Sequence, residues 1–378
     1  MRPWQSDRSG FDFTGTYSAV DKPALIEYTM NDGRNVKVVF VSKGNQTTVT
    51  EMFEAEQVHS LEMQRAGWQA IVDNFKNYVE RAEGTSVQKI IPHLWFDKEA
   101  KEAAAFYTTL FENSKVTNVT TIPGTPSGDC EVVTFDLAGQ AFMAMSAGPY
   151  FKLNPSISLF VVFDSEKEID AVWNKLVQGS KVLMPYAAYP WAYKYGWLQD
   201  RYGLSWQLSW SEHHKLEQKI TPLLMFTKEQ AGKAKAAIEA YTGIFPNAQP
   251  QVLVQYAKGD GDKEGLIKHA RFTLAGQAFM AMDSSLPHAF SFNEALSFVV
   301  HCATQEEIDY YWKKLSAVPG AEQCGWLKDQ FGVSWQIVPS AMSDMMAHGS
   351  KEQIARVTKA VLKMKKLDSE ALKHAYGT

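Results

Sequence analysis

The sequence predicts an α+β fold built from two tandem copies of one unit, with a segment of different character before them and a helical tail after them. The first observation behind this prediction is an internal repeat: Gly-Gln-Ala-Phe-Met-Ala-Met occurs at 139–145 and again, letter for letter, at 276–282. The second is that predicted strands and helices alternate within each copy. We therefore expect helices to cover one face of a curved sheet and the other face to form a concavity.

The composition is that of an ordinary folded protein and excludes several classes. Of the 378 residues, 45% are hydrophobic and 21% are charged, and the formal net charge is −4. Without a basic block we expect no nucleic-acid partner. The densest apolar run, 157–163, is too short to span a membrane. Three cysteines are too few for a disulfide framework, and no charged-then-apolar leader follows Met1, so we expect a cytoplasmic protein.

Within each copy the strands and helices follow a fixed order. A strand at 90–96 or 220–226 precedes a helix and short strands, and a second strand beginning at 157 or 296 repeats this order. We place the first copy at 89–212 and the second at 218–339, after an N-terminal segment at 1–84.

The tail, residues 340–378, is predicted to be helical. Apolar residues recur at three- and four-residue spacing among lysines. We expect this amphipathic helix to pack on its own domain or on a partner subunit. Membrane docking is the alternative, which the net charge and the lack of aromatic residues on this face disfavour. The stripe consists of Ile354, Val357, Val361, Met364 and Leu367.

Three motifs together resemble one branch of a known superfamily. They are Pro-His-Leu-Trp-Phe at 92–96, the repeated heptapeptide, and Gly-Trp-Leu…Asp…Gly-x-Ser-Trp-Gln, which closes the copies at 207 and 336. They resemble the PhnB-like branch of the vicinal oxygen chelate superfamily, which includes glyoxalase I, extradiol dioxygenases and bleomycin-resistance proteins. This branch is often labelled 3-demethylubiquinone 3-methyltransferase-like. The resemblance covers about two thirds of the chain and implies tandem domains built of paired βαβββ modules.

The N-terminal segment resembles a different family. Gly-Phe-Asp-Phe at 10–13, Asp-Gly-Arg at 32–34 and Gly-Trp-Gln-Ala-Ile at 67–71 are similar to the second half of an SRPBCC (START-like) helix-grip domain. The resemblance implies a partial domain whose long C-terminal helix covers 61–81. Whether a partner completes this half domain is left open.

Metal ligands in the superfamily lie on inward-facing strand positions, and His93 and Gln207 are the weak candidates for them here. One imidazole and one neutral amide are a poor site for a divalent metal, so we expect no metal and no other cofactor. In the second copy Leu223 and Met225 stand where the first has His93 and Trp95. His93 is also the candidate catalytic residue, although a buried histidine bonded to Gln207 or to a backbone carbonyl is an equally good interpretation.

The predicted ligand pocket lies in the first copy. The 20-residue stretch from Leu176 to Gly196, twice as long as its counterpart in the second copy, is expected to form a lid over it. The second copy is then a structural partner. The expected pocket residues are His93, Trp95, Met143, Phe160, Trp197 and Gln207.

Three functions remain open at this point. The first is a binding protein for a small molecule, without a complete metal site. A metal-dependent lyase, isomerase or dioxygenase of the same superfamily is the second, and a structural or assembly protein is the third. We expect a small-molecule ligand and a homo-oligomer, and the sequence does not identify the ligand.

Overall fold

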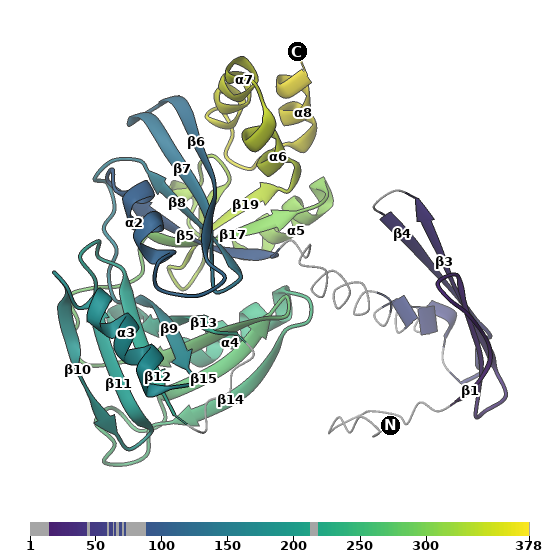
Figure 1. The fold of residues 1–378 in the computed structure, drawn as a ribbon, viewed down its shortest axis with the longest axis horizontal. Helices are drawn as coiled ribbons and strands as arrows, with labels where there is room; N and C mark the ends of the chain where they lie inside the picture. Colours follow the sequence, from purple (N-terminus) through teal and green to yellow (C-terminus); the bar gives the residue numbers. More distant parts are fainter. Residues whose placement is uncertain are drawn as a thin grey trace. The chain divides into compact units, whose positions relative to one another are not determined.

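The structure is a computed structural model, and it divides into two compact units, residues 1–87 and residues 88–378 (Figure 1). No helix among the described residues is long and apolar enough to cross a membrane. The described residues are 15–43, 46–58, 60–62, 64–65, 68–69, 72, 88–211 and 218–377.

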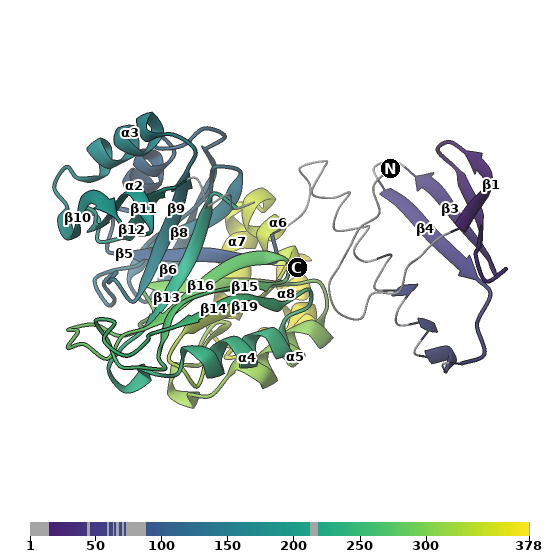
Figure 2. The same ribbon diagram turned by 90° about the horizontal axis from the view of Figure 1, so that it is seen from below.

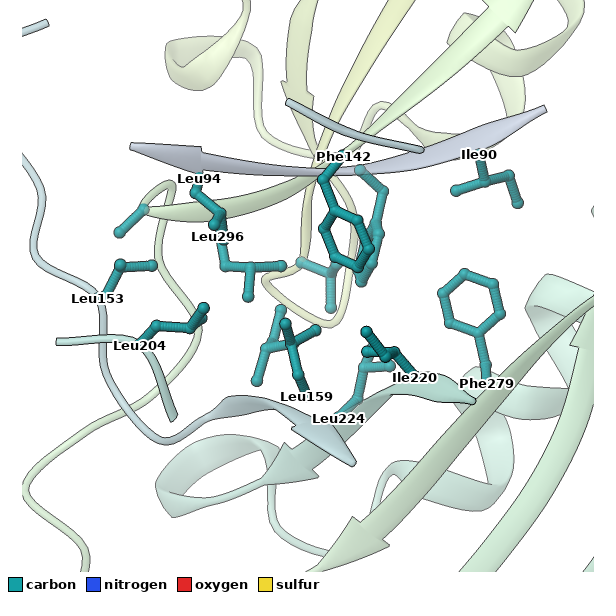
Figure 3. Close-up of a cluster of buried hydrophobic side chains, with 14 of the residues drawn as sticks. Ile90, Leu94, Phe142, Leu153, Leu159, Leu204, Ile220, Leu224, Phe279 and Leu296 are labelled. Atoms are coloured by element: carbon teal, nitrogen blue, oxygen red, sulfur yellow. The ribbon is translucent and has the colours of Figure 1, made fainter. Parts of the chain in front are cut away.

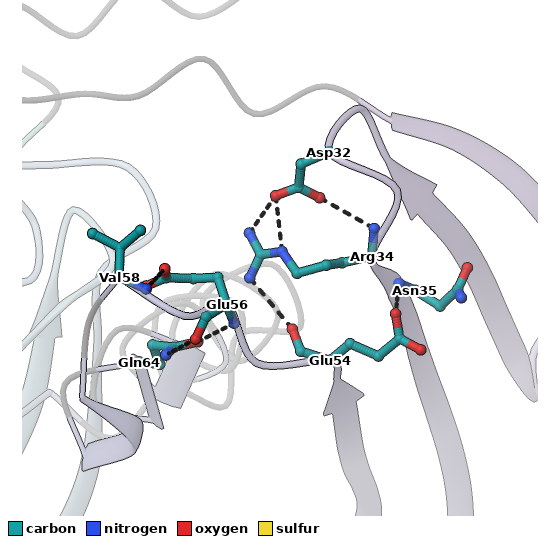
Figure 4. Close-up of polar contacts among 7 residues, drawn as sticks. All are labelled: Asp32, Arg34, Asn35, Glu54, Glu56, Val58 and Gln64. Atoms are coloured by element: carbon teal, nitrogen blue, oxygen red, sulfur yellow. Dashed lines mark hydrogen bonds and ion pairs between the residues drawn. The ribbon is translucent and has the colours of Figure 1, made fainter.

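The first unit contains an antiparallel four-stranded sheet in the order β1-β2-β3-β4. In the turn between β2 and β3, Arg34 donates from Nε to Asp32 (2.8 Å) and from Nη1 to the Glu54 carbonyl (3.3 Å), which ties the turn to the end of β4 (Figure 4). Most of the helix expected over 61–81 lies outside the described residues. The strands are β1 (Gly15–Asp21), β2 (Leu25–Met30), β3 (Asn35–Lys43) and β4 (Gln46–Phe53).

In the second unit each copy contains two strand-helix-strand halves. The first copy consists of β5 (Ile90–Phe96), α2 (Ala100–Tyr107), β6 (Lys115–Thr125), β7 (Gly128–Leu137) and β8 (Gln140–Ser146), then β9 (Ile157–Phe163), α3 (Glu166–Leu176), β10 (Lys181–Tyr189), β11 (Ala192–Gln199) and β12 (Ser205–Trp210). The second consists of β13 (Ile220–Phe226), η1 (Lys228–Gln230), α4 (Ala234–Ile244), β14 (Gln249–Gln255), β15 (Ile267–Leu274) and β16 (Gln277–Asp283), then β17 (Leu296–Cys302), α5 (Gln305–Leu315), η2 (Pro319–Ala321), β18 (Trp326–Lys328) and β19 (Ser334–Pro339).

The two copies exchange halves. The seven-stranded sheet, in the order β18-β19-β17-β5-β8-β7-β6, joins the first half of copy one to the second half of copy two. The eight-stranded sheet, in the order β10-β11-β12-β9-β13-β16-β15-β14, joins the other two halves. Antiparallel pairing makes each junction, with His93 opposite Ser297 and Leu223 opposite Ser158. Each copy is therefore a unit of sequence whose halves belong to different sheets.

The repeated heptapeptide helps to hold this exchange together. Its glutamine in copy two, Gln277, accepts a hydrogen bond from the Ile90 N–H and donates to the Ile90 carbonyl, both at 2.8 Å. In copy one, Gln140 accepts from the Ile220 N–H at 3.0 Å. Each glutamine thus fixes the start of the other copy's first strand, which gives a structural reason for its presence in both copies.

One apolar core joins the two sheets. In Figure 3, Ile90 and Leu94 of β5 face Leu159, Ile220 and Leu224 of the other sheet across this core. Trp206 and Trp335, near the ends of the two copies, are fully buried in it. Figure 2 shows α4 and α5 next to each other along one side of the unit. Since the core lies between the sheets, the opposite face of each sheet is available to form a site.

The tail packs on its own domain, as one of the two alternatives predicted. It forms three helices and not the single amphipathic helix expected. The helix that carries the start of the apolar stripe, α7, ends at Val361, before Met364 and Leu367. Val357, Val361 and Leu367 form an apolar cluster with Val299 and residues of the seven-stranded sheet. The helices are α6 (Ala341–His348), α7 (Lys351–Val361) and α8 (Ser369–Gly377).

Candidate functional site

Each sheet has a face directed away from the shared core, and we call these faces the first and second bowl. Pairing registers make their positions equivalent. The first bowl, on the seven-stranded sheet, includes His93, Trp95, Met143, Ser297, Val299, His301, Trp326, Ser334 and Gln336. The second, on the eight-stranded sheet, has Leu223, Met225, Met280, Ser158, Phe160, Val162, Trp197, Ser205 and Gln207 at the corresponding positions.

The first bowl contains a cavity of about 1070 Å³. Its floor is the seven-stranded sheet, and α6 and α7 of the tail supply another wall through Met342, Met346, Thr358 and Val361. The volume is at the upper end of the range typical of small-molecule sites. The tail that the sequence predicts to pack on its own domain is therefore part of the wall of the site.

His93 lies deep in this bowl and is uncharged. Burial away from water lowers its pKa from 6.5 to about 3. Gln336 Nε2 donates to Ser297 Oγ at 3.0 Å, and Ser297 Oγ lies 3.4 Å from His93 Nδ1. Ser297 Oγ can then donate its own proton to Nδ1, and in that arrangement the ring proton of His93 lies on Nε2. The predicted bond to Gln207 is absent, because Gln207 is in the other sheet.

Aromatic rings form one end of the cavity. The Trp326 ring meets the His93 ring edge to face, with centroids 5.5 Å apart, and meets the Trp95 ring at 6.0 Å. Phe151 packs edge to face on Trp95 at 5.1 Å, and Trp95 Nε1 donates to the Gly148 carbonyl at 2.8 Å. These contacts hold Trp95 in place, so the aromatic wall is formed before any ligand arrives.

The residues at this point do not fit a divalent metal. His93 is surrounded by Met143, Ser297 and Gln336, all neutral, and its Nδ1 already faces Ser297. Divalent metals bind more strongly where several donors, some of them charged, converge. Among the described residues, no group of three or more His, Cys, Asp or Glu side chains could hold a metal ion.

The second bowl is filled by its own side chains. Leu223, Met225 and Met280 are buried there and pack with Phe160 and Trp197. The polar groups are also paired: Tyr195 donates to Gln207 Oε1 at 2.8 Å, and Trp197 Nε1 donates to Ser205 Oγ at 2.8 Å. Ser205 and Ser158 share a further hydrogen bond at 2.9 Å. The second bowl thus bonds the polar groups of Gln207, Trp197 and Ser205, although Ser209 Oγ and Thr221 Oγ1 are buried on this face without a partner among the described residues.

The six predicted pocket residues are divided between the two bowls. His93, Trp95 and Met143 line the cavity of the first bowl. Phe160, Trp197 and Gln207 belong to the second, so the prediction of one pocket within copy one is wrong. The cause is the exchange of halves, which a repeat in the sequence does not reveal. The second copy is likewise more than a structural partner, because its β17 and β19 line the cavity.

The predicted lid between Leu176 and Gly196 is also corrected. Most of this stretch forms β10 and the start of β11, which extend the eight-stranded sheet. Tyr189, at the end of β10, meets Tyr195 edge to face at 5.5 Å. The segment therefore belongs to the second bowl, on the sheet that lacks His93.

Sequence reasoning missed three polar residues of the cavity. Ser334, His301 and Thr358 each line it and carry a buried side-chain atom with no hydrogen-bond partner among the described residues. Strand alternation could have found Ser334, two positions before Gln336 and on the same face. Thr358 had no comparable signal, because its place in the cavity follows from how the tail packs.

Comparison with known families agrees with the motifs. The family model described as 3-demethylubiquinone-9 3-methyltransferase matches residues 88–209 and 218–338. The chain belongs to this family. The model described as Activator of Hsp90 ATPase homolog 1-like protein matches residues 2–80. The resemblances of the tandem domains and of the N-terminal segment are thus confirmed. Among curated proteins, none matches this member of the 3-demethylubiquinone-9 3-methyltransferase family.

Solved structures also resemble parts of this family member. A PhnB protein from Bacillus cereus is 39% identical, covers 33% of this chain and 100% of its own, and gives a TM-score of 0.31. An AHSA1-like protein from Aeromonas hydrophila is 51% identical over 20% of this chain, with a TM-score of 0.19. The chain spans about half of that relative, 52% of its length. A glyoxalase I mutant from Zea mays is 12% identical, covers 69% of this chain and 97% of its own, and has a TM-score of 0.45.

Proposed function

We propose that the chain is a small-molecule-binding protein and that its binding site is the cavity of the first bowl. The observation that carries this proposal is the contrast between two equivalent bowls. The second packs its own apolar side chains together and bonds Ser205, whereas the first encloses a cavity of about 1070 Å³ and leaves the equivalent Ser334 Oγ without a partner among the described residues. Because a buried polar atom without a partner costs free energy, a ligand that supplies one would be stabilised there.

Particular substitutions between the copies account for the cavity. Phe160 of the second bowl corresponds to Val299 of the first, and Tyr195 corresponds to Cys324. Both changes replace a ring with a small side chain, and both Val299 and Cys324 line the cavity. The space therefore arises where the first bowl lacks two rings that fill the second.

The alternative of a metal-dependent enzyme has less support. The neutral set of His93, Ser297, Met143 and Gln336 suits a metal poorly, as described above. A His93→Ala variant tests the role of this ring. Unchanged ligand affinity in the folded variant would exclude an essential role of His93 in binding.

The test fills the first bowl with the rings that the second bowl contains. The neutral dye Nile red serves as the probe, and its fluorescence reports binding to an apolar site. We expect about one dye per chain in the unchanged protein and a loss of binding in Val299→Phe and Cys324→Tyr. Phe160→Val is the matched control, since it changes the second bowl only and should keep dye binding in the first. Absence of dye binding, or full binding by the folded Val299→Phe variant, would refute the proposal.

A further inference from the structure

The polar end of the cavity contains a serine hydroxyl without a hydrogen-bond partner among the described residues, whereas the equivalent serine of the second bowl is bonded. In the second bowl, Ser205 Oγ is bonded to Trp197 Nε1 and to Ser158 Oγ. In the first bowl, Ser334 stands in place of Ser205, only 1% of it is exposed, and its Oγ has no hydrogen-bond partner within the described part of the chain. Equivalent positions in one protein thus differ in whether their polar atoms are satisfied.

This difference between Ser205 and Ser334 follows from the presence of Tyr195 in the second bowl and of Cys324 at the corresponding position in the first. In the second bowl the tyrosine hydroxyl holds the amide of Gln207. Its counterpart Gln336 has a thiol-bearing residue at that place, and its amide instead donates to Ser297. Ser297 corresponds to Ser158, the serine that bonds Ser205 in the second bowl. Because Ser297 is engaged by Gln336 and His93, Ser334 is left without a partner.

Three groups at this end, on His93, Ser334 and Trp326, can each donate a hydrogen bond to a ligand. With Ser297 donating to Nδ1, His93 carries its ring proton on Nε2, and the Ser334 hydroxyl has a proton to give. No hydrogen bond from the Trp326 indole is found within the residues that the structure describes, whereas its counterpart Trp197 is bonded. Donors without acceptors favour a ligand atom that only accepts, such as a carbonyl oxygen.

The charge of the lining indicates a neutral ligand. In the part of the chain that the structure describes, no lysine or arginine lines the cavity. Of its two acidic residues, Asp344 is exposed on α6, and Glu294 is paired with Lys328 at 2.7 Å. A carboxylate or phosphate would therefore lose its hydration without gaining a cation. The rest of the wall is mostly apolar, with Met143, Val299, Val338 and Val361 among its residues.

We propose that the first bowl binds a neutral, mostly apolar molecule and anchors its carbonyl-type oxygen between Ser334, Trp326 and His93. This inference rests on the proposed binding function and adds the chemical class of the ligand. The apolar body of the molecule lies along Val299 and Val338 toward the tail helix α7. The anchor requires no metal and no charged side chain.

The test uses benzophenone and diphenylmethane, which are similar in size and differ in one carbonyl oxygen. Each is titrated against bound Nile red to obtain its dissociation constant. In Ser334→Ala we expect the affinity ratio of benzophenone to diphenylmethane to fall about five- to tenfold, the effect of losing one buried hydrogen bond. Trp326→Phe, which keeps a ring, should lower the ratio as well. The anionic 4-benzoylbenzoate should bind more weakly than benzophenone.

Matched controls come from the second bowl. Ser205→Ala and Trp197→Phe remove the equivalent groups there and should leave the ratio unchanged. An equal fall in these controls, an unchanged ratio in Ser334→Ala, or displacement of the dye by neither compound would overturn the carbonyl anchor while binding itself remains. Failure of Nile red to bind at all would instead refute the proposed function.

Discussion

Two buried histidines of the first bowl should make the protein sensitive to acid. Burial lowers the pKa of His93 to about 3 and that of His301 to about 4, and nearby Lys89 lowers the latter further. In the unfolded chain both titrate near 6.5. Below that pH the unfolded chain binds protons that the folded chain does not. The stability is therefore complete above about pH 6.5 and is lost progressively as the pH falls.

The size of the effect follows from these pKa values. At pH 5 each histidine should cost about 2 kcal/mol of folding free energy relative to pH 8. We expect His93→Gln and His301→Gln each to reduce the loss of stability between pH 8 and pH 5 by about that amount. Urea unfolding of the full chain, followed by tryptophan fluorescence at both pH values, measures it. Comparing differences between pH values removes the packing cost of each substitution.

The control is His348→Gln on helix α6, because His348 is exposed. This variant should lose as much stability as the unchanged protein between pH 8 and pH 5. If His93→Gln also behaved like the unchanged protein, His93 would have to titrate in the folded state as it does in water. The dry, neutral bowl that we infer would then be wrong.

Three further variants test the framework around the site. Asp329→Ala should cost about 3 kcal/mol or more, because it leaves Trp335 Nε1 and other buried donors without their acceptor, and thermal unfolding measures this loss. Gln277→Ala should cost about 1–3 kcal/mol by removing both hydrogen bonds to Ile90, and a cost near zero in urea unfolding would contradict its role in the exchange. Val357→Asp puts a charge between α7 and the sheet, so limited proteolysis should cut the tail faster; an unchanged rate would refute the packing.

Much of the fold could be predicted because the relevant signals are local. The heptapeptide repeat marks equivalent hairpins, and Ala138 and Gly139 between β7 and β8 both have positive φ, as a two-residue hairpin turn requires. The amphipathic spacing in the tail likewise predicted the side that packs inward: Val357, Val361 and Leu367 are buried there, and Ile354 and Met364 are half-buried. Such patterns depend on neighbours in sequence and need no knowledge of which sheet a strand joins.

The site could be predicted only in part because it depends on pairing over long distances. His93, Trp95 and Met143 line the same cavity, since β5 and β8 of the same half pair directly. The glutamine that lies near His93 was predicted to be Gln207 and is Gln336, because the two glutamines occupy equivalent positions in two nearly identical motifs. The sequence around each glutamine does not indicate which of them lies near His93, because the pairing of β5 with β17 determines it.

The central claim is that one binding cavity is assembled from the first half of copy one, the second half of copy two and the tail. Photolabelling with benzophenone tests it most directly, because the activated ketone forms covalent bonds with the side chains around it. Peptide mass spectrometry should find the adducts in β8 near Met143, in β17 or β19 near Val299 and Val338, and in the tail near Val361. Adducts concentrated around Phe160 and Leu223 in the second bowl would contradict the account.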